Sequence, residues 1–212
     1  KAFAVFGVAV GVWLIGGTLV DLNRRLAGGG LKRLGKLSLG VWGMTIAHIG
    51  LGVFVVGAVA ETNGRIERTF ALAPGETAQM ADWQFTFNGV RSGEGPNFYA
   101  DIASITAKTG GREIQLAPQK RFYPAAGMPT TEVAIRKSAQ GDLYVALGEP
   151  LRDTPGGWTV RASFNPLIDW VFFGSGLIAL GGFLSFAARA RRSKSIAVQP
   201  EATGATKMEP AE

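Results

Sequence analysis

Leu39–Ala60 reads LGVWGMTIAHIGLGVFVVGAVA, and this stretch decides the class of fold. It is apolar throughout, and its only ionisable residue is His48. About 20 such residues in a helix cross a bilayer core of roughly 30 Å. The stretch therefore predicts a membrane-spanning helix over residues 39–60. Small residues recur near one face at helical spacing, which predicts close packing on a neighbouring helix. They are Gly43, Ala47, Gly50 and Gly57.

Two further apolar stretches flank this one and predict two more spans, over residues 1–20 and 166–188. The first has no charge between Ala2 and Val20, and Gly7 and Gly11 form a G-x-x-x-G pair. It is not a signal peptide, because a charged Asp21-Leu-Asn-Arg-Arg follows instead of small residues for cleavage. Asp169 and Trp170 stand at the start of the third span, where an interfacial tryptophan is expected.

The formal net charge of +6 is concentrated beside the predicted spans. Residues 21–38 form a basic loop, and basic residues also begin the stretch 189–212, which is polar and predicted to be a disordered tail. Cytoplasmic loops collect Lys and Arg, so both segments are expected in the cytoplasm, and residues 61–165 in the periplasm of a Gram-negative cell. Residues 61–166 carry equal numbers of acidic and basic residues, which argues against nucleic acid as a partner.

Residues 61–165 predict an all-β domain, a small sandwich or barrel of about seven strands. Short runs with partial alternation are separated by turn signals such as Pro74-Gly75 and Gly110-Gly111. The predicted strands are 65–72, 78–90, 98–108, 113–123, 132–137, 143–147 and 158–164. Trp83 and Trp158 are expected in the core of this domain.

Few side chains outside the spans suggest chemistry. The chain has no cysteine, which excludes disulfides, thiol nucleophiles and cysteine-held metals. Glu132 and Asp142 lie in ordinary strand or turn contexts, so we assign no catalytic residue. Lys120-Arg121-Phe122-Tyr123-Pro124 combines cations and aromatic rings. It can contact a haem propionate or a partner protein, or it is a plain strand end with snorkelling side chains.

His48 is the strongest single candidate. It is the only histidine in the chain, and it lies within an apolar span. An intramembrane ionisable residue needs a partner, and a neutral imidazole is a ligand for haem iron. Gly52, one turn further, is expected to leave room for a flat macrocycle beside the ring. A structural hydrogen bond and a proton relay are alternative roles. One histidine supplies a single ligand, so a second ligand would lie outside this chain.

Several short motifs occur together in a specific order. They are Gly43-Met-Thr-Ile-Ala-His48-Ile-Gly50, Gly95-Pro-Asn-Phe-Tyr99, Gln119-Lys-Arg-Phe-Tyr123, Met128-Pro-Thr-Thr-Glu132 and Asp142-Leu-Tyr-Val-Ala-Leu-Gly-Glu149. Over roughly Trp13 to Ala188 the chain resembles the C-terminal region of the CcmF family of cytochrome c-type biogenesis proteins.

The resemblance implies a multi-pass protein of the bacterial inner membrane that attaches haem covalently to the Cys-x-x-Cys-His thiols of apocytochrome c. It also implies an intramembrane haem b, with His48 at the position of an axial iron ligand. The partners implied are a haem chaperone, apocytochrome c, an apocytochrome-presenting assembly subunit, the N-terminal part of the same protein and membrane lipid.

Three features of the family pattern are missing from this sequence. The tryptophan-rich WWD segment, the two lumenal histidines and the second transmembrane axial histidine of the family are absent. We expect them in a preceding segment or in a separate chain, so these residues alone should not form a competent lyase. A different hypothesis is a membrane-anchored module whose β domain docks apocytochrome or assembly partners without chemistry of its own. A paralogue that serves a specialised cytochrome would share these motifs.

Overall fold

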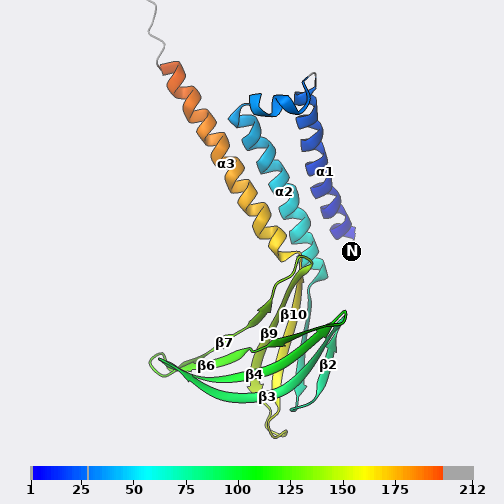
Figure 1. Ribbon diagram of the computed structural model, residues 1–212, viewed down its shortest axis with the longest axis vertical. Coiled ribbons are helices and arrows are strands. Elements are labelled where there is room, and N and C mark those ends of the chain that lie inside the picture. The colour runs from blue at the N-terminus through cyan, green and yellow to red at the C-terminus, as the bar shows by residue number, and fades with distance from the viewer. Residues whose placement is uncertain (1, 28, 198–212) are drawn as a thin grey trace, which may run out of the picture. The chain divides into compact units, whose positions relative to one another are not determined.

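The computed structural model describes residues 2–27 and 29–197 (Figure 1). It contains three long α-helices, α1 (Ala2–Leu26), α2 (Leu39–Gly64) and α3 (Ile168–Ala197), with a 3-10 helix, η1 (Gly30–Lys36), between the first two. Each long helix is apolar and long enough to cross a membrane. Together with the β domain below, this confirms the predicted class of a membrane protein with three helices and a β-rich domain.

The end of α3 differs from the sequence-based prediction. A disordered tail was predicted from residue 189, whereas α3 continues through the basic residues to Ala197. Residues 198–212, the rest of that predicted tail, lie outside the described residues. The helix continues because Ala187–Arg192 contains only alanine and arginine, both strong helix formers, and no glycine or proline. The basic residues therefore do not end the helix.

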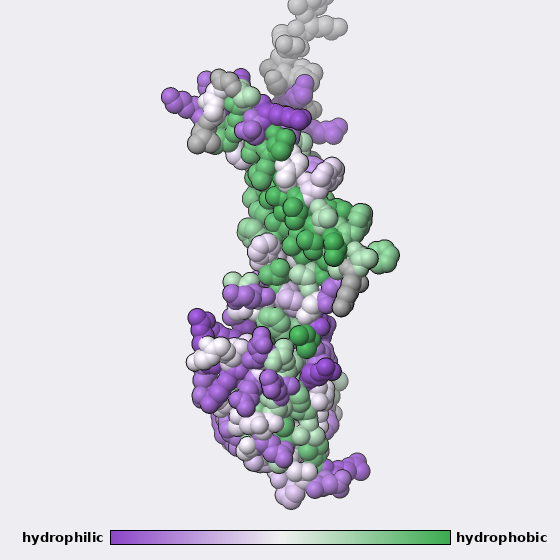
Figure 2. Space-filling view, turned by 90° about the vertical axis from the view of Figure 1, so that its right-hand side faces the viewer, coloured by the Kyte–Doolittle hydropathy of each residue, from purple (hydrophilic) through white to green (hydrophobic). Residues whose placement is uncertain are grey.

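The chain divides into two compact units. One contains the β domain with the adjoining helix ends, residues up to Val8 and Val55–Phe172. The other contains the remaining helical segments, Ala9–Phe54 and the chain from Phe173 onward. Hydrophobic residues gather over the helices, and hydrophilic residues gather near the basic loop and over the β domain (Figure 2).

Glycine allows α2 and α3 to approach to backbone contact within the helical unit. A Cβ placed on Gly43 would lie 2.7 Å from the Gly181 carbonyl oxygen, and one on Gly181 would lie 2.5 Å from the Gly43 oxygen. Gly50 and Gly174 form a second reciprocal pair, with corresponding distances of 2.9 and 2.7 Å. The predicted packing face of α2 is therefore confirmed. Such small-residue faces drive helix association where lipid removes the hydrophobic force.

Gly181→Ala should destabilise the helical unit, because its new methyl group would lie 2.5 Å from the Ala47 nitrogen. Overpacking of this kind costs about 1–3 kcal/mol. Gly182→Ala is the matched control, because no described atom lies within 4 Å of a Cβ there. It should stabilise α3 through helix propensity by up to about 1 kcal/mol. Unfolding of the detergent-solubilised chain, followed by circular dichroism, measures both; equal shifts would refute the close contact.

The β domain contains ten strands in two antiparallel sheets. The four-stranded sheet has the order β1-β10-β9-β8, and the six-stranded sheet has the order β2-β3-β4-β6-β7 with β5 paired to β4. The strands are β1 (Ile66–Leu72), β2 (Thr77–Met80), β3 (Trp83–Gly95), β4 (Phe98–Thr109), β5 (Arg112–Leu116), β6 (Gln119–Tyr123), β7 (Met128–Glu132), β8 (Ala134–Arg136), β9 (Gly141–Pro150) and β10 (Trp158–Pro166).

The core of this sandwich lies between the two sheets and follows the period-2 alternation of the strands. Phe85 and Phe87 of β3 lie opposite Ala107 and Ile105 of β4, and all four are fully buried. Leu143, Val145 and Leu147 of β9 and Val160 of β10 supply buried residues from the other sheet. Trp83 and Trp158 are partly buried and pack against this core, as predicted.

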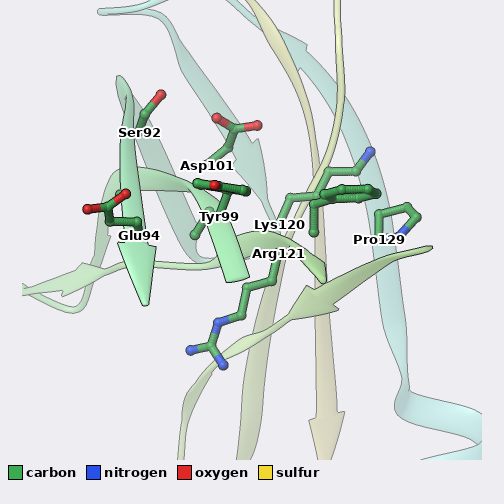
Figure 3. Close-up of a pocket in the computed structure, with 10 residues that line it drawn as sticks. Ser92, Glu94, Tyr99, Asp101, Lys120, Arg121 and Pro129 are labelled. Atoms are coloured by element: carbon green, nitrogen blue, oxygen red, sulfur yellow. The ribbon is translucent and has the colours of Figure 1, made fainter. Parts of the chain in front are cut away.

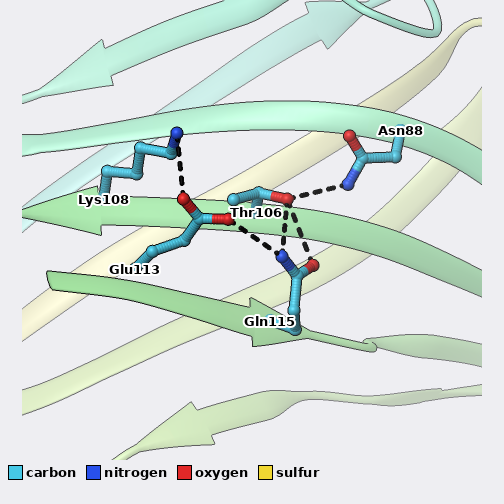
Figure 4. Close-up of polar contacts among 5 residues, drawn as sticks. All are labelled: Asn88, Thr106, Lys108, Glu113 and Gln115. Atoms are coloured by element: carbon cyan, nitrogen blue, oxygen red, sulfur yellow. Dashed lines mark hydrogen bonds and ion pairs between the residues drawn. The ribbon is translucent and has the colours of Figure 1, made fainter.

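The outer face of the six-stranded sheet carries a polar network (Figure 4). Asn88 Nδ2 donates to Thr106 Oγ1 at 2.9 Å, and the Gln115 amide exchanges hydrogen bonds with the same hydroxyl at 3.0 and 3.1 Å. Lys108 pairs with Glu113 at 3.0 Å in the adjacent cross-strand position. Cross-strand pairs of this type stabilise a sheet and keep its outer face in water.

The structure has more strands than the sequence predicted, for three local reasons. Ala81, with φ of 50°, makes a tight turn that divides the predicted strand 78–90 into β2 and β3. Pro118 lies between β5 and β6 and divides the predicted strand 113–123. β7 was not predicted because it contains Pro129, which cannot donate to a ladder and is tolerated in an edge strand such as β7.

Candidate functional site

His48 lies within the membrane-spanning part of α2, nine residues after Leu39, which is about 14 Å along the axis at 1.5 Å per residue. Its side chain is exposed on the helix surface. The ring nitrogen Nδ1 lies 2.8 Å from the Met44 carbonyl oxygen, one turn earlier in the helix. The imidazole is therefore held at one nitrogen by its own helix.

This hydrogen bond sets the tautomer of the ring. A carbonyl oxygen only accepts, so Nδ1 must carry the proton. In the neutral ring the lone pair then belongs to Nε2, which has no hydrogen-bond partner among the described residues. A histidine that donates from one nitrogen and offers the other is the usual arrangement of a metal-ligating imidazole. The structural hydrogen bond uses only one nitrogen, so the other is open to a metal or to a proton, the two further roles considered for His48.

His48 opens into a groove between α1 and α2 with a volume of about 320 Å³. Both helices belong to the helical unit here. Most of the lining is apolar or small, and the far end is charged. The lining residues are Trp13, Leu14, Gly17, Thr18, Asp21, Arg25, Met44 and His48. At the charged end Arg25 Nε lies 2.7 Å from Asp21 Oδ2.

The sequence did not identify the α1 side of this groove. Trp13 lies within α1 and lines the groove. Trp13, Gly17 and Asp21 follow one another at four-residue spacing, which places them along one face of a helix. That spacing was visible in the sequence. The missing information was which face of α1 meets α2, because this depends on tertiary packing.

The expectation for Gly52 is wrong. It was assigned the role of leaving room for a macrocycle beside His48, but its surroundings are filled by α1. A Cβ on Gly52 would lie 2.5 Å from Ile15 Cγ1 and 2.8 Å from the Gly11 carbonyl oxygen. Gly52 therefore serves helix packing, and Gly11 of the predicted G-x-x-x-G pair is its counterpart on α1.

No group of three or more His, Asp or Glu side chains that could hold a metal ion occurs within residues 2–27 and 29–197. His48 is the one imidazole of the whole chain. A metal held here would therefore have one imidazole ligand from this chain.

Both cations of β6, Lys120 and Arg121, form ion pairs within the β domain. Lys120 pairs with Glu149 of β9. Arg121 Nη1 lies 3.4 Å from Glu132 Oε1, and its guanidinium lies 4.4 Å above the Phe98 ring. Glu132 thus has a structural partner. This favours the strand-end reading over a site for a haem propionate, because neither cation is free.

Asp142 is almost fully buried, at 1% exposure, and holds the turn before β9. It accepts a hydrogen bond from the Ser138 amide at 3.4 Å and lies 3.7 Å from Lys137 Nζ. Lys137 in turn donates to Asp169 Oδ1 at 3.0 Å, which links this turn to the first turn of α3. The hydrogen bond and the charge of Asp169, together with the charge of Asp142, raise the pKa of Lys137 above its ordinary 10.5.

Lys137→Gln should lower the stability of the β domain by a small amount that is constant from pH 6 to 9. The pKa of Lys137 is higher in the folded state, so its contribution is fully present below the unfolded value of 10.5 and is lost as the pH rises through the folded value. Urea unfolding followed by tryptophan fluorescence at pH 7, 9 and 11 tests this. Arg136→Gln is the control, because arginine does not titrate in this range; a Lys137 difference that persists unchanged at pH 11 would contradict the linkage.

Comparisons with known proteins agree on the same relatives. Residues 63–166 match the family model described as the CcmF C-terminal beta-sandwich. The cytochrome c-type biogenesis protein CcmF of Pseudomonas fluorescens is 41% identical over 175 residues, covering 82% of this chain and 26% of that protein. Its counterpart in Escherichia coli strain K12 is 34% identical over 184 residues, covering 86% of this chain and 27% of that protein.

The chain corresponds to a C-terminal region of the CcmF family. A solved structure of the cytochrome c haem lyase CcmF has the same fold, with a TM-score of 0.68 over 86% of this chain and 30% of that one, at 17% sequence identity. The chain spans about a quarter of the length of the CcmF relatives it matches. It is a membrane-bound CcmF region.

Proposed function

We propose that this chain is the C-terminal part of a haem lyase that acts in cytochrome c maturation and that it holds an intramembrane haem b through His48. The observation that carries the ligand role is the Nδ1–H bond from His48 to the Met44 carbonyl, at 2.8 Å, which leaves Nε2 without a hydrogen-bond partner in a side chain that lines the groove. The family match adds the context, since the relatives are named cytochrome c-type biogenesis proteins.

The groove residues fit a haem in chemistry. Trp13 and Leu14 offer apolar contact to a macrocycle, and His48 offers a nitrogen to iron. Arg25 is the cation in the lining, and it now pairs with Asp21. It would pair with a haem propionate, either in place of Asp21 or in addition to it. The groove volume of about 320 Å³ holds part of a haem, so the remaining wall would come from the N-terminal part of the protein.

A haem bound here supplies one-electron transfer, and its axial ligands set its potential. The residues of this chain would position and tune it. Met44 orients the His48 ring through its carbonyl oxygen, and a hydrogen-bonded imidazole is the more basic ligand. Arg25 and Asp21 would fix which end of the haem faces the basic loop. Covalent attachment of haem to apocytochrome c thiols would take place at residues of the family that this chain does not contain.

The proposed topology places residues 21–38 in the cytoplasm and the β domain in the periplasm of the inner membrane. The basic loop and the arginines of α3 support it through the preference of Lys and Arg for cytoplasmic segments. In this orientation His48 lies nearer the cytoplasmic end of α2, since nine residues separate it from Leu39 and sixteen from Gly64. Apocytochrome c, its presenting subunit and the haem chaperone would meet the protein on the periplasmic side.

A second candidate function is a docking module for apocytochrome or assembly partners. It is favoured by large side chains on the β domain that the fold leaves exposed, among them Tyr99 at 60% and Phe122 at 44% exposure. Both functions can occur in one protein, because the first needs the helical unit and the second needs the β domain.

His48→Ala should remove most of the haem b absorbance from the protein purified in detergent together with its N-terminal part. The iron would lose one of two axial ligands, and the remaining contacts are mainly apolar. Reduced-minus-oxidised spectra and haem content per protein measure the effect. Imidazole added to the His48→Ala protein should restore part of the spectrum by occupying the vacated position.

Leu51→Ala is the matched control, since Leu51 is also exposed on α2 but does not line the groove. It should keep the parental spectrum. Identical spectra for His48→Ala and its parent would remove His48 from the iron. Absence of haem from both proteins would favour the docking module.

A further inference from the structure

Two aromatic rings and a proline form a row on the inner face of the six-stranded sheet, outside the sandwich core. Tyr99 of β4, Phe122 of β6 and Pro129 of β7 are direct cross-strand neighbours, and we call them the aromatic shelf. Tyr99 alternates with Asp101, Ala103 and Ile105, so it points to the same side as the buried core. The shelf nevertheless remains exposed, and it lines an open pocket of about 670 Å³ (Figure 3).

The second sheet does not cover the shelf. In the row next to it, Asp101 and Lys120 are cross-strand partners. Lys120 is only 16% exposed and pairs with Glu149, close to the end of β9 in the opposite sheet. That ion pair marks where the two sheets cease to face one another, and the shelf lies beyond it. The inner face therefore continues past the part of the core that the fold itself encloses.

The opposite side of these strands holds the shelf rigid. Phe98 and Tyr123 pack with ring centroids 5.5 Å apart, and the Arg121 guanidinium lies over Phe98. Gly95 makes room for this cluster, because a Cβ there would collide with the Phe98 ring. A surface fixed in this way loses little entropy when it binds a ligand.

The charges around the shelf select a cation. Glu94 is the cross-strand partner of Tyr99, and Asp101 lies in the next row. Neither carboxylate forms an ion pair or hydrogen bond within the described part of the chain. The two cations that line the pocket, Lys120 and Arg121, are neutralised by Glu149 and Glu132. An anionic ligand such as a haem propionate or a lipid phosphate would meet two unpaired carboxylates in the lining, and the cations there already have acidic partners.

We propose that the shelf binds an extended polypeptide segment of a partner protein that carries a basic and an apolar side chain. The pocket is lined from β3 across to β7, three inter-strand spacings or about 14 Å. An extended segment of about four residues covers that length at roughly 3.3 Å per residue. Its apolar side chain would rest on Phe122 and Pro129, and its Lys or Arg would reach Glu94 and Asp101 over the Tyr99 face. This rests on the docking role proposed above and names its site.

The test uses the whole chain in detergent and two fluorescein-labelled peptides. One places lysine and phenylalanine two residues apart with glycine between them, so that both side chains lie on the same face of the extended chain, and the other has glutamate in place of lysine. Fluorescence anisotropy should show binding of the lysine peptide only, with an affinity that falls as salt is raised. Tyr99→Ala, and separately Glu94→Gln combined with Asp101→Asn, should each weaken binding by roughly tenfold or more, as loss of a central contact does. Tyr99→Phe should keep the affinity and so shows that the ring, and not the fold, is responsible.

Two controls lie outside the shelf. Glu113→Gln removes an exposed carboxylate on the outer face of the same sheet, and Met128→Ala removes an exposed apolar side chain at 57% exposure. Both should leave binding unchanged. Equal binding of the two peptides, or no effect of the Tyr99 and carboxylate variants, overturns the proposal. Binding should also survive His48→Ala, so loss of haem in that variant and loss of peptide binding in the shelf variants test the two functions separately.

Discussion

Backbone contact between helices, permitted by glycine, is the constraint on which the helical unit depends. Gly43 and Gly50 of α2 contact the backbone of α3, and Gly52 of α2 contacts Gly11 and Ile15 of α1. At about 100° per residue, His48 lies some 140° around α2 from Gly43, and thus away from α3. The same helix can therefore pack tightly on one neighbour and present an imidazole to a groove beside the other. Larger residues at the glycine positions would separate the helices and open the groove.

A different rule governs the β domain. There the alternation of strand residues determines burial, and the second sheet decides how much of an inner face is enclosed. Ala103 and Ile105 are buried because β9 and β10 lie opposite, whereas Tyr99 continues the same alternation beyond that cover. Rings that stay exposed on an inner face do not contribute the free energy that burial of their apolar area would give. The shelf is thus a feature that folding alone does not explain.

Much of this architecture could be predicted from local sequence. The apolar stretches indicated the helices, the spacing of Gly43 and Gly50 indicated a packing face, and His48 stood out as the one histidine. What failed depended on tertiary contacts. Gly52 lies one helical turn from His48, and this spacing alone suggests a small residue beside an open site. Only the position of Ile15 on α1 shows that the space at Gly52 is filled. The aromatic shelf was missed for a related reason, because no local pattern reveals where the opposite sheet ends.

The two candidate sites differ in how complete they are. The groove offers one imidazole, one cation–carboxylate pair and part of a wall, so a haem bound there would be only partly enclosed by the residues of this chain. The shelf is made by three strands of one domain and is supported on the opposite side of the sheet by Phe98, Arg121 and Tyr123. A ligand of the shelf therefore needs no further protein to complete its site. A CcmF C-terminal region would thus combine a cofactor site that depends on the rest of the protein with a polypeptide site that its β domain forms alone.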